Sequence, residues 1–135
     1  LPSTAEHFDA YALEGVRVLA VEDDADTREV LRTILQAAGA DVRTAESVRE
    51  GKQVFEDWRP SVLLSDISMP DEDGYALIGW LRARPADAGG KVPAAALTAF
   101  VGLKDARQVR ASGFQRCLTK PIEAHVLVKA VAEWR

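Results

Sequence analysis

Short runs of apolar residues alternate along the chain with stretches in which apolar residues recur every three or four positions. The first run, residues 16–21, is rich in β-branched side chains and leads into acidic residues 22–24, which predicts a buried strand that ends in a polar loop. The next stretch predicts a helix that Asp24 or Asp26 caps and Gly39 closes. Its expected core-facing residues are Val30, Leu31, Ile34 and Leu35.

The same unit of strand, loop and helix recurs four more times. Further strands are predicted at residues 41–44, 61–66, 92–97 and 114–118, and further helices at about 47–58, 75–81, 103–112 and 123–134. In the last helix the residues expected to face inward are Val126, Leu127, Ala130, Val131 and Trp134. Strands that are apolar on both faces and alternate with helices predict an α/β fold, a doubly wound five-stranded parallel sheet with five helices.

The remaining segments lack a clear period. Residues 85–90 predict a plain loop, and residues 1–15 predict a linker ahead of one domain at residues 16–135. Because the chain starts without Met and stops within a helical pattern, we interpret it as a segment of a longer protein.

Composition and charge exclude several classes of protein. A chain of 135 residues suits one domain, and 17 Lys and Arg against 21 Asp and Glu leave no basic surplus for nucleic-acid binding. Cys117 is the only cysteine, so an intrachain disulfide is excluded. The apolar runs are far shorter than the ~20 residues that span a bilayer. We therefore expect a soluble cytoplasmic domain without membrane contact of its own.

Polar side chains stand at the carboxyl ends of four predicted strands. Glu22 and Asp23 follow the first strand, Asp66 ends the third, Thr98 follows the fourth and Lys120 follows the fifth. Ligands of doubly wound sheets bind outside the carboxyl ends of the strands, so these side chains should converge. Three clustered carboxylates repel one another, which predicts a bound divalent cation. Oxygen ligands favour Mg²⁺, with Mn²⁺ as a substitute.

This set of residues suits phosphoryl transfer. An oxygen of Asp66 can attack phosphorus, because a carboxylate nucleophile can form an aspartyl-phosphate. Lys120 would balance the charge of the transferring group while Thr98 donates a hydrogen bond to one of its oxygens. The sequence therefore predicts a metal-dependent phosphoacceptor site.

Four segments, in this order, give the chain a family resemblance. They are VEDD at residues 21–24, SDISMPDEDG at 65–74, LTAF at 97–100 and LTKP at 118–121. Together they resemble the landmarks of the receiver domain of two-component response regulators, over roughly residues 15–135. The resemblance implies a flavodoxin-like fold with strand order 2-1-3-4-5.

The resemblance also implies roles for individual residues. Asp66 would be the phosphoacceptor, and Thr98 and Lys120 would contact the phosphoryl group. The ligands of Mg²⁺ would be Glu22, Asp23, Asp66 and the backbone carbonyl of Ser68. The bond between Lys120 and Pro121 is expected to be cis, a form that X-Pro bonds readily adopt.

One position departs from the family pattern. Receivers usually carry Tyr or Phe three residues before the lysine, where the ring moves inward as the threonine moves toward phosphate, but this chain has Cys117. Either the switch works through this smaller side chain, or another group such as Phe100 reports the state. The candidate switch residues are therefore Thr98, Phe100 and Cys117.

The resemblance implies partners as well as chemistry. The phosphoryl group would come from the phosphohistidine of a histidine kinase or of a histidine phosphotransfer protein, and a homodimer is left open. The domain would catalyse its own phosphorylation and dephosphorylation. Residues 1–15 resemble the junction that precedes the C-terminal receiver of hybrid histidine kinases, so the parent would be such a kinase. The alternative parent is a response regulator whose output domain has been removed.

Two other functions fit part of the sequence. The run Asp24-Ala-Asp26-Thr27 superficially resembles the aspartate motif of haloacid-dehalogenase-type phosphohydrolases. That family needs an acidic pair after its lysine. In this chain the only acidic residues after Lys120 are Glu123 and Glu133, which are ten residues apart. A degenerate receiver that serves only as an interaction module is disfavoured because all five catalytic-type residues are present.

Overall fold

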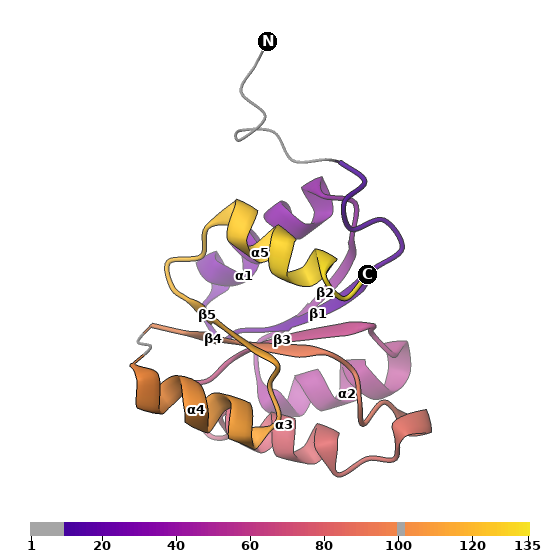
Figure 1. Cartoon of the computed structure of the whole chain (residues 1–135). Helices are drawn as coiled ribbons and strands as arrows, with labels where there is room; N and C mark the ends of the chain where they lie inside the picture. Colours follow the sequence, from indigo (N-terminus) through magenta and orange to yellow (C-terminus); the bar gives the residue numbers. More distant parts are fainter. Residues whose placement is uncertain (1–9, 100–101) are drawn as a thin grey trace.

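Five parallel strands form a sheet at the centre of the molecule, in the order β2-β1-β3-β4-β5 (Figure 1). This is a computed structural model, and it describes residues 10–99 and 102–135. The strands are β1 (Arg17–Val21), β2 (Asp41–Ala45), β3 (Val62–Asp66), β4 (Ala94–Thr98) and β5 (Arg116–Thr119). The predicted parallel sheet and its strand order are confirmed.

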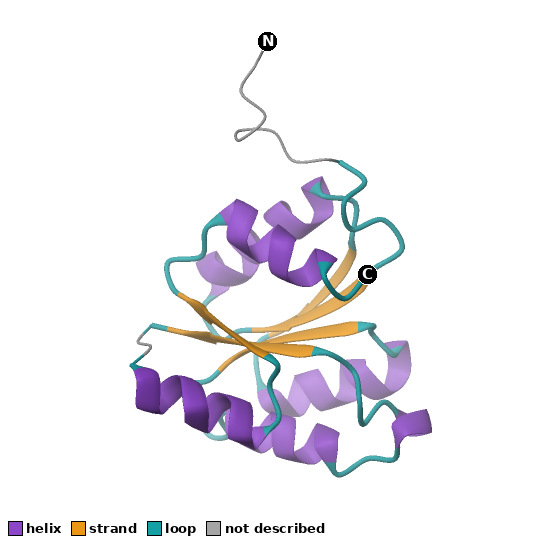
Figure 2. Ribbon diagram, in the orientation of Figure 1, coloured by secondary structure: helices purple, strands orange, loops and turns teal. Residues whose placement is uncertain are grey.

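Helices cover both faces of the sheet, which lies between two helical layers (Figure 2). They are α1 (Ala25–Ala37), α2 (Val48–Trp58), α3 (Gly74–Arg82), α4 (Leu103–Ser112) and α5 (Ala124–Ala132). Helices α1 and α5 lie on one face, and α2, α3 and α4 lie on the other (Figure 1). A short 3-10 helix at Ala86–Ala88 interrupts the predicted plain loop; the N–H of Gly89, at φ 93°, donates to the carbonyl of Ala86.

The core consists of one apolar layer on each face of the sheet. In β1, Val18 and Ala20 belong to the layer under α1 and α5, whereas Leu19 and Val21 belong to the layer under α2, α3 and α4. All four side chains are fully buried. Successive side chains of a strand point to opposite faces, so a strand covered on both sides reads as a continuous apolar run.

A side-chain cap fixes where α1 begins. Asp24 rather than Asp26 caps α1, because its carboxylate accepts a hydrogen bond from the backbone N–H of Thr27 at 2.9 Å. Gly39 follows the helix at φ 98°, a left-handed conformation that favours glycine. The Asp24 cap places the first turn of α1 directly after the acidic end of β1.

Two residues predicted to face the core lie on the surface instead. Val30 of α1 is 49% exposed and Val126 of α5 is 42% exposed. In each helix the fully buried positions, such as Leu31 and Leu127, set the centre of the apolar stripe, and the neighbouring valine lies about 100° around the helix from it.

The core extends into the segment ahead of β1. Leu13 is fully buried, and its backbone N–H donates to the carbonyl of Ala38 at 2.8 Å, whereas Tyr11 is 66% exposed. The last residues of the expected linker therefore pack against the end of α1. In the described part of the chain, each helix is too short or too polar to cross a membrane.

Candidate functional site

The candidate site lies where β1 and β3 end side by side. Val21 pairs with Ser65, so Glu22, which follows β1, and Asp66, the last residue of β3, lie at the same level of the sheet. The chain reverses its strand order between these two strands, since β2 lies on one side of β1 and β3 lies on the other. Such a reversal opens the crevice in which doubly wound sheets bind their ligands.

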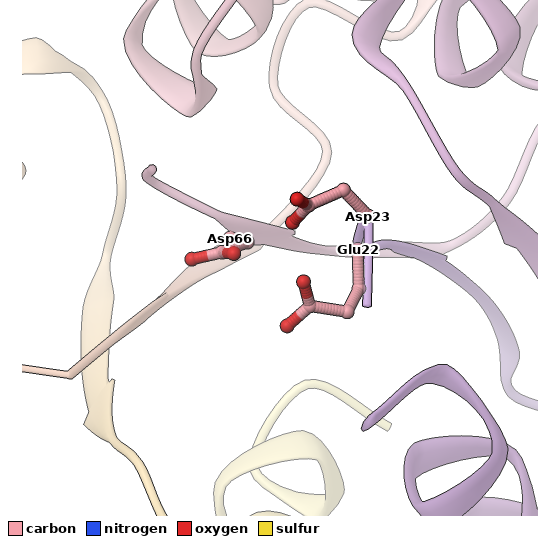
Figure 3. Close-up of side chains that lie close together, drawn as sticks. All are labelled: Glu22, Asp23 and Asp66. Carbon is pink, nitrogen blue, oxygen red and sulfur yellow. The ribbon is translucent and has the colours of Figure 1, made fainter. Parts of the chain in front are cut away.

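Three carboxylates meet at this edge, as the sequence predicts (Figure 3). One oxygen each from Glu22, Asp23 and Asp66 lies within 4.8 Å of the others. Glu22 is completely buried and Asp66 is 5% exposed, whereas Asp23 lies on the surface. The cluster is enclosed by protein on one side and reaches solvent on the other, so it could hold a divalent cation that keeps part of its water shell.

Lys120 reaches this cluster from the residues that follow β5, the strand at the edge of the sheet. Its ammonium donates to Oε1 of Glu22 at 2.5 Å and to Oδ2 of Asp66 at 3.1 Å. Its backbone N–H donates to the carbonyl of Thr98 at 2.8 Å, and the bond to Pro121 is cis, as the family resemblance implies. One positive charge thus lies among three carboxylates.

The charges of the site shift the pKa values of two of its groups. Burial raises the pKa of Glu22 to about 7, although hydrogen bonds from Lys120 and from the N–H of Asp24 lower it. Burial lowers the pKa of Lys120, but hydrogen bonds to Glu22 and Asp66 raise it by more, so the net shift is upward. Lys120 alone therefore does not offset the cost of burying the ionised carboxylate of Glu22. A bound cation would stabilise this ionised form near neutral pH.

The loop between β3 and α3 folds closely over Asp66. The N–H of Ser68 donates to Oδ1 of Asp66 at 3.3 Å, and the N–H of Gly74 donates to the carbonyl of Ile67 at 2.9 Å. A Cβ atom at position 74 would lie 2.3 Å from the carbonyl oxygen of Asp66, so only glycine fits there. The structure thus shows a contact for the amide of Ser68, and the metal-binding role of its carbonyl stays a prediction.

The candidate switch residues lie near β4 and β5. Thr98 ends β4 and is half-buried, next to the backbone of Lys120. Cys117 of β5 is also half-buried and packs against the apolar layer under α2, α3 and α4; burial raises the pKa of its thiol. Phe100 lies outside the described residues. The switching roles of all three stay predictions.

Arg28, in the first turn of α1, is a site residue that the sequence does not predict. Its guanidinium donates to the backbone carbonyls of Glu22 and Asp23, at 2.9 Å and 3.0 Å. An arginine shortly after an acidic pair was the only sequence signal for this contact. Asp24 lies outside the cluster; its carboxylate accepts from both the N–H and the hydroxyl of Thr27, which lowers its pKa.

Comparisons of the sequence agree with this geometry. The family model of the response regulator receiver domain matches residues 18–132. The chain is 39% identical over 122 residues to an uncharacterized 14.6 kDa protein of Leptolyngbya boryana, covering 90% of this chain and 92% of that protein. It is also 39% identical over 106 residues to the virulence transcriptional regulatory protein PhoP of Salmonella typhimurium. That match covers 78% of this chain but 46% of PhoP, so the chain spans about half of that relative.

Solved structures show the same fold. Chemotaxis protein CheY4 of Vibrio cholerae superimposes with a TM-score of 0.82 and 28% identity, covering 89% of this chain and 98% of that one. The signal receiver domain of a signal transduction histidine kinase from Syntrophus aciditrophicus superimposes with a TM-score of 0.79 and 30% identity, covering 89% of each chain. With its family match, its strand order and its cluster of acidic residues, the chain belongs to the family of response regulator receiver domains of two-component signalling.

Proposed function

We propose that this domain accepts a phosphoryl group on Asp66 from the phosphohistidine of a histidine kinase or of a histidine phosphotransfer protein. The arrangement around Asp66 carries the proposal. This carboxylate is almost fully buried; the ammonium of Lys120 contacts one of its oxygens and the N–H of Ser68 contacts the other. A nucleophilic oxygen and two hydrogen-bond donors therefore lie together beside Glu22 and Asp23.

Glu22, Asp23 and Asp66 are the proposed ligands of Mg²⁺, together with the carbonyl of Ser68, and Mn²⁺ is the proposed substitute. The donor set fits these ions because it consists of oxygen atoms alone and carries more negative charge than Lys120 can balance. When bound, the cation would neutralise charge that develops on the phosphoryl oxygens.

The chemistry follows from the positions of the side chains. An oxygen of Asp66 forms a bond to phosphorus while the bond from phosphorus to the donor imidazole breaks, and its electron pair stays on the leaving nitrogen. Lys120 turns from the carboxylates to an oxygen of the phosphoryl group, and the hydroxyl of Thr98 donates to another. These movements would bias β4, β5 and α4, with Phe100 and Cys117 as the candidate reporters of the switch.

The surface next to the site suits a docking partner. The exposed side chain of Val30 lines a hollow of about 230 Å³ together with Lys120, Pro121 and Ile122. A partner that covers this apolar surface would bring its phosphohistidine close to Asp66. The histidine-containing partner is therefore proposed to approach along α1 and the loop that follows β5.

We propose a hybrid histidine kinase as the parent, with a linker at residues 1–15, the last residues of which pack against α1, and the receiver at residues 16–135. The likeness to a receiver domain of a histidine kinase, at 30% identity, supports this parent. The match to the transcriptional regulator PhoP instead favours a response regulator with an output domain. The sequence of the complete parent protein distinguishes the two.

Phosphorylation by acetyl phosphate tests the proposal. The wild-type chain should gain the mass of one phosphoryl group when Mg²⁺ is present and none when EDTA removes it, as measured by intact mass spectrometry. Asp66→Asn should abolish the gain. Asp71→Asn, an exposed residue of the same loop, is the matched control and should leave it intact. A folded wild-type chain that gains no phosphoryl mass contradicts the proposal.

A further inference from the structure

Arg28 of α1 reaches back to the loop that the helix follows. A single nitrogen of its guanidinium, Nη1, donates to the carbonyl of Glu22 at 2.9 Å and to that of Asp23 at 3.0 Å. The backbone N–H of Arg28 donates to the carbonyl of Asp24, also at 2.9 Å. Hydrogen bonds from a charged donor are stronger than those between neutral groups. The residue therefore holds three successive peptide carbonyls at the end of β1.

These carbonyls belong to the residues that carry the acidic pair. The N–H of Glu22 still pairs with the carbonyl of Ala45 at 2.9 Å, after which the chain leaves the sheet and enters α1 at Ala25. Fixing the peptide planes on both sides of Asp23 fixes the directions in which Glu22 and Asp23 project their side chains. Arg28 thus acts on the geometry of the carboxylates without touching them in the described contacts.

The positive charge of Arg28 opposes cation binding, whereas its hydrogen bonds to the backbone favour it. Its other terminal nitrogen, Nη2, lies 3.8 Å from Oε2 of Glu46, whose side chain is 67% exposed. A fixed positive charge close to the cluster repels an incoming cation. Loss of the charge alone would therefore strengthen Mg²⁺ binding, whereas loss of the hydrogen bonds would weaken it.

We propose that Arg28 is a positioning residue that holds the backbone of Glu22 and Asp23 so that their carboxylates are preorganised for the divalent cation. This inference rests on the proposed function of the site and adds to it a residue outside the predicted set. Groups that orient metal ligands in this way typically contribute 10- to 100-fold to metal affinity.

Calorimetric titration with Mg²⁺ at constant ionic strength tests the inference, with the unfolding temperature of the metal-free protein as a second readout. Arg28→Met should weaken Mg²⁺ binding about 10-fold. Arg28→Gln, which also loses the charge and the two-carbonyl contact, should change affinity in the same direction and serves as a second variant. Arg32→Met is the matched control, because Arg32 lies one turn further along α1 and contacts the hydroxyl of Thr44 instead. It should bind Mg²⁺ as tightly as wild type.

The outcomes separate the two proposals. Equal or tighter Mg²⁺ binding by the Arg28 variants overturns the positioning role while leaving the proposed function of Asp66 standing. An equal loss of affinity in Arg32→Met also overturns it, because the effect would then belong to α1 as a whole. Failure of the wild-type protein to bind Mg²⁺ overturns both the proposed function and the role of Arg28.

Discussion

Replacing Glu22 by Gln should change how the stability of the metal-free domain depends on pH. In the folded protein, burial raises the pKa of Glu22 from 4.5 to about 7. Between these values the folded state keeps a proton that the unfolded state releases. The free energy of unfolding therefore falls as pH rises through this window. Gln carries no proton to lose, so the variant should lack this part of the pH dependence.

The size of the effect follows from the two pKa values of Glu22. One pKa unit corresponds to about 1.4 kcal/mol, so the full shift corresponds to about 3 kcal/mol. Between pH 5 and pH 8, the stability of the wild type should fall relative to that of Glu22→Gln by roughly 2–3 kcal/mol. The contact with Lys120 adds no separate pH dependence, because its lowering effect is already included in the pKa of Glu22 and Lys120 keeps its charge throughout this range.

Urea unfolding in EDTA at pH 5, 6, 7 and 8 measures this difference. Glu29→Gln provides a control for the loss of one negative charge, because Glu29 lies exposed on α1 outside the cluster. A difference between wild type and Glu22→Gln that is the same at pH 5 and pH 8 would refute the reasoning. In that case the buried carboxylate would titrate as it does in the unfolded chain.

Other substitutions probe the neighbourhood of the site. Gly74→Ala should lower the free energy of unfolding by about 1–3 kcal/mol, because the new Cβ would clash with the carbonyl of Asp66. Gly79→Ala, with open space around its Cβ, should raise it by roughly 0.5–1 kcal/mol; chemical denaturation measures both. Lys120→Met should tighten Mg²⁺ binding in a calorimetric titration, because it removes the ammonium that competes with Mg²⁺ for Glu22. The same substitution should slow phosphorylation by acetyl phosphate. Because protons compete with Mg²⁺ at Glu22, titrations of the wild type should show affinity rising with pH up to about 7 and then levelling off.

The acidic cluster could be predicted because strand ends are visible in the sequence. The apolar runs of β1 and β3 stop at acidic residues, and parallel strands of a doubly wound sheet bring those ends to one edge. This rule predicts that the acidic side chains lie close together, but it does not predict which of them are buried. Glu22 and Asp23 are neighbours in sequence, yet one is fully buried and the other exposed, because successive side chains project in different directions.

Other features of the site depend on side-chain reach, which no periodicity reveals. Lys120 contacts Glu22 from a loop on the far side of β4 and β3, and only the folded sheet shows that the distance can be spanned. The contact of Arg28 with two backbone carbonyls is equally invisible, since an arginine on a helix usually reads as a solvated charge. The predicted inward position of Val30 is wrong for a related reason, because an apolar residue at the border of a helical stripe can face either the core or solvent.

Chemical trapping of the phosphorylated residue tests the central claim most directly. Borohydride reduces an aspartyl-phosphate to homoserine, and peptide sequencing by mass spectrometry then locates the converted residue. After treatment with acetyl phosphate and Mg²⁺, homoserine should appear at position 66 and nowhere else. Homoserine at Asp23 or Asp24 in place of Asp66, or its absence from a chain that has gained a phosphoryl group, would contradict the assignment of Asp66 as the phosphoacceptor.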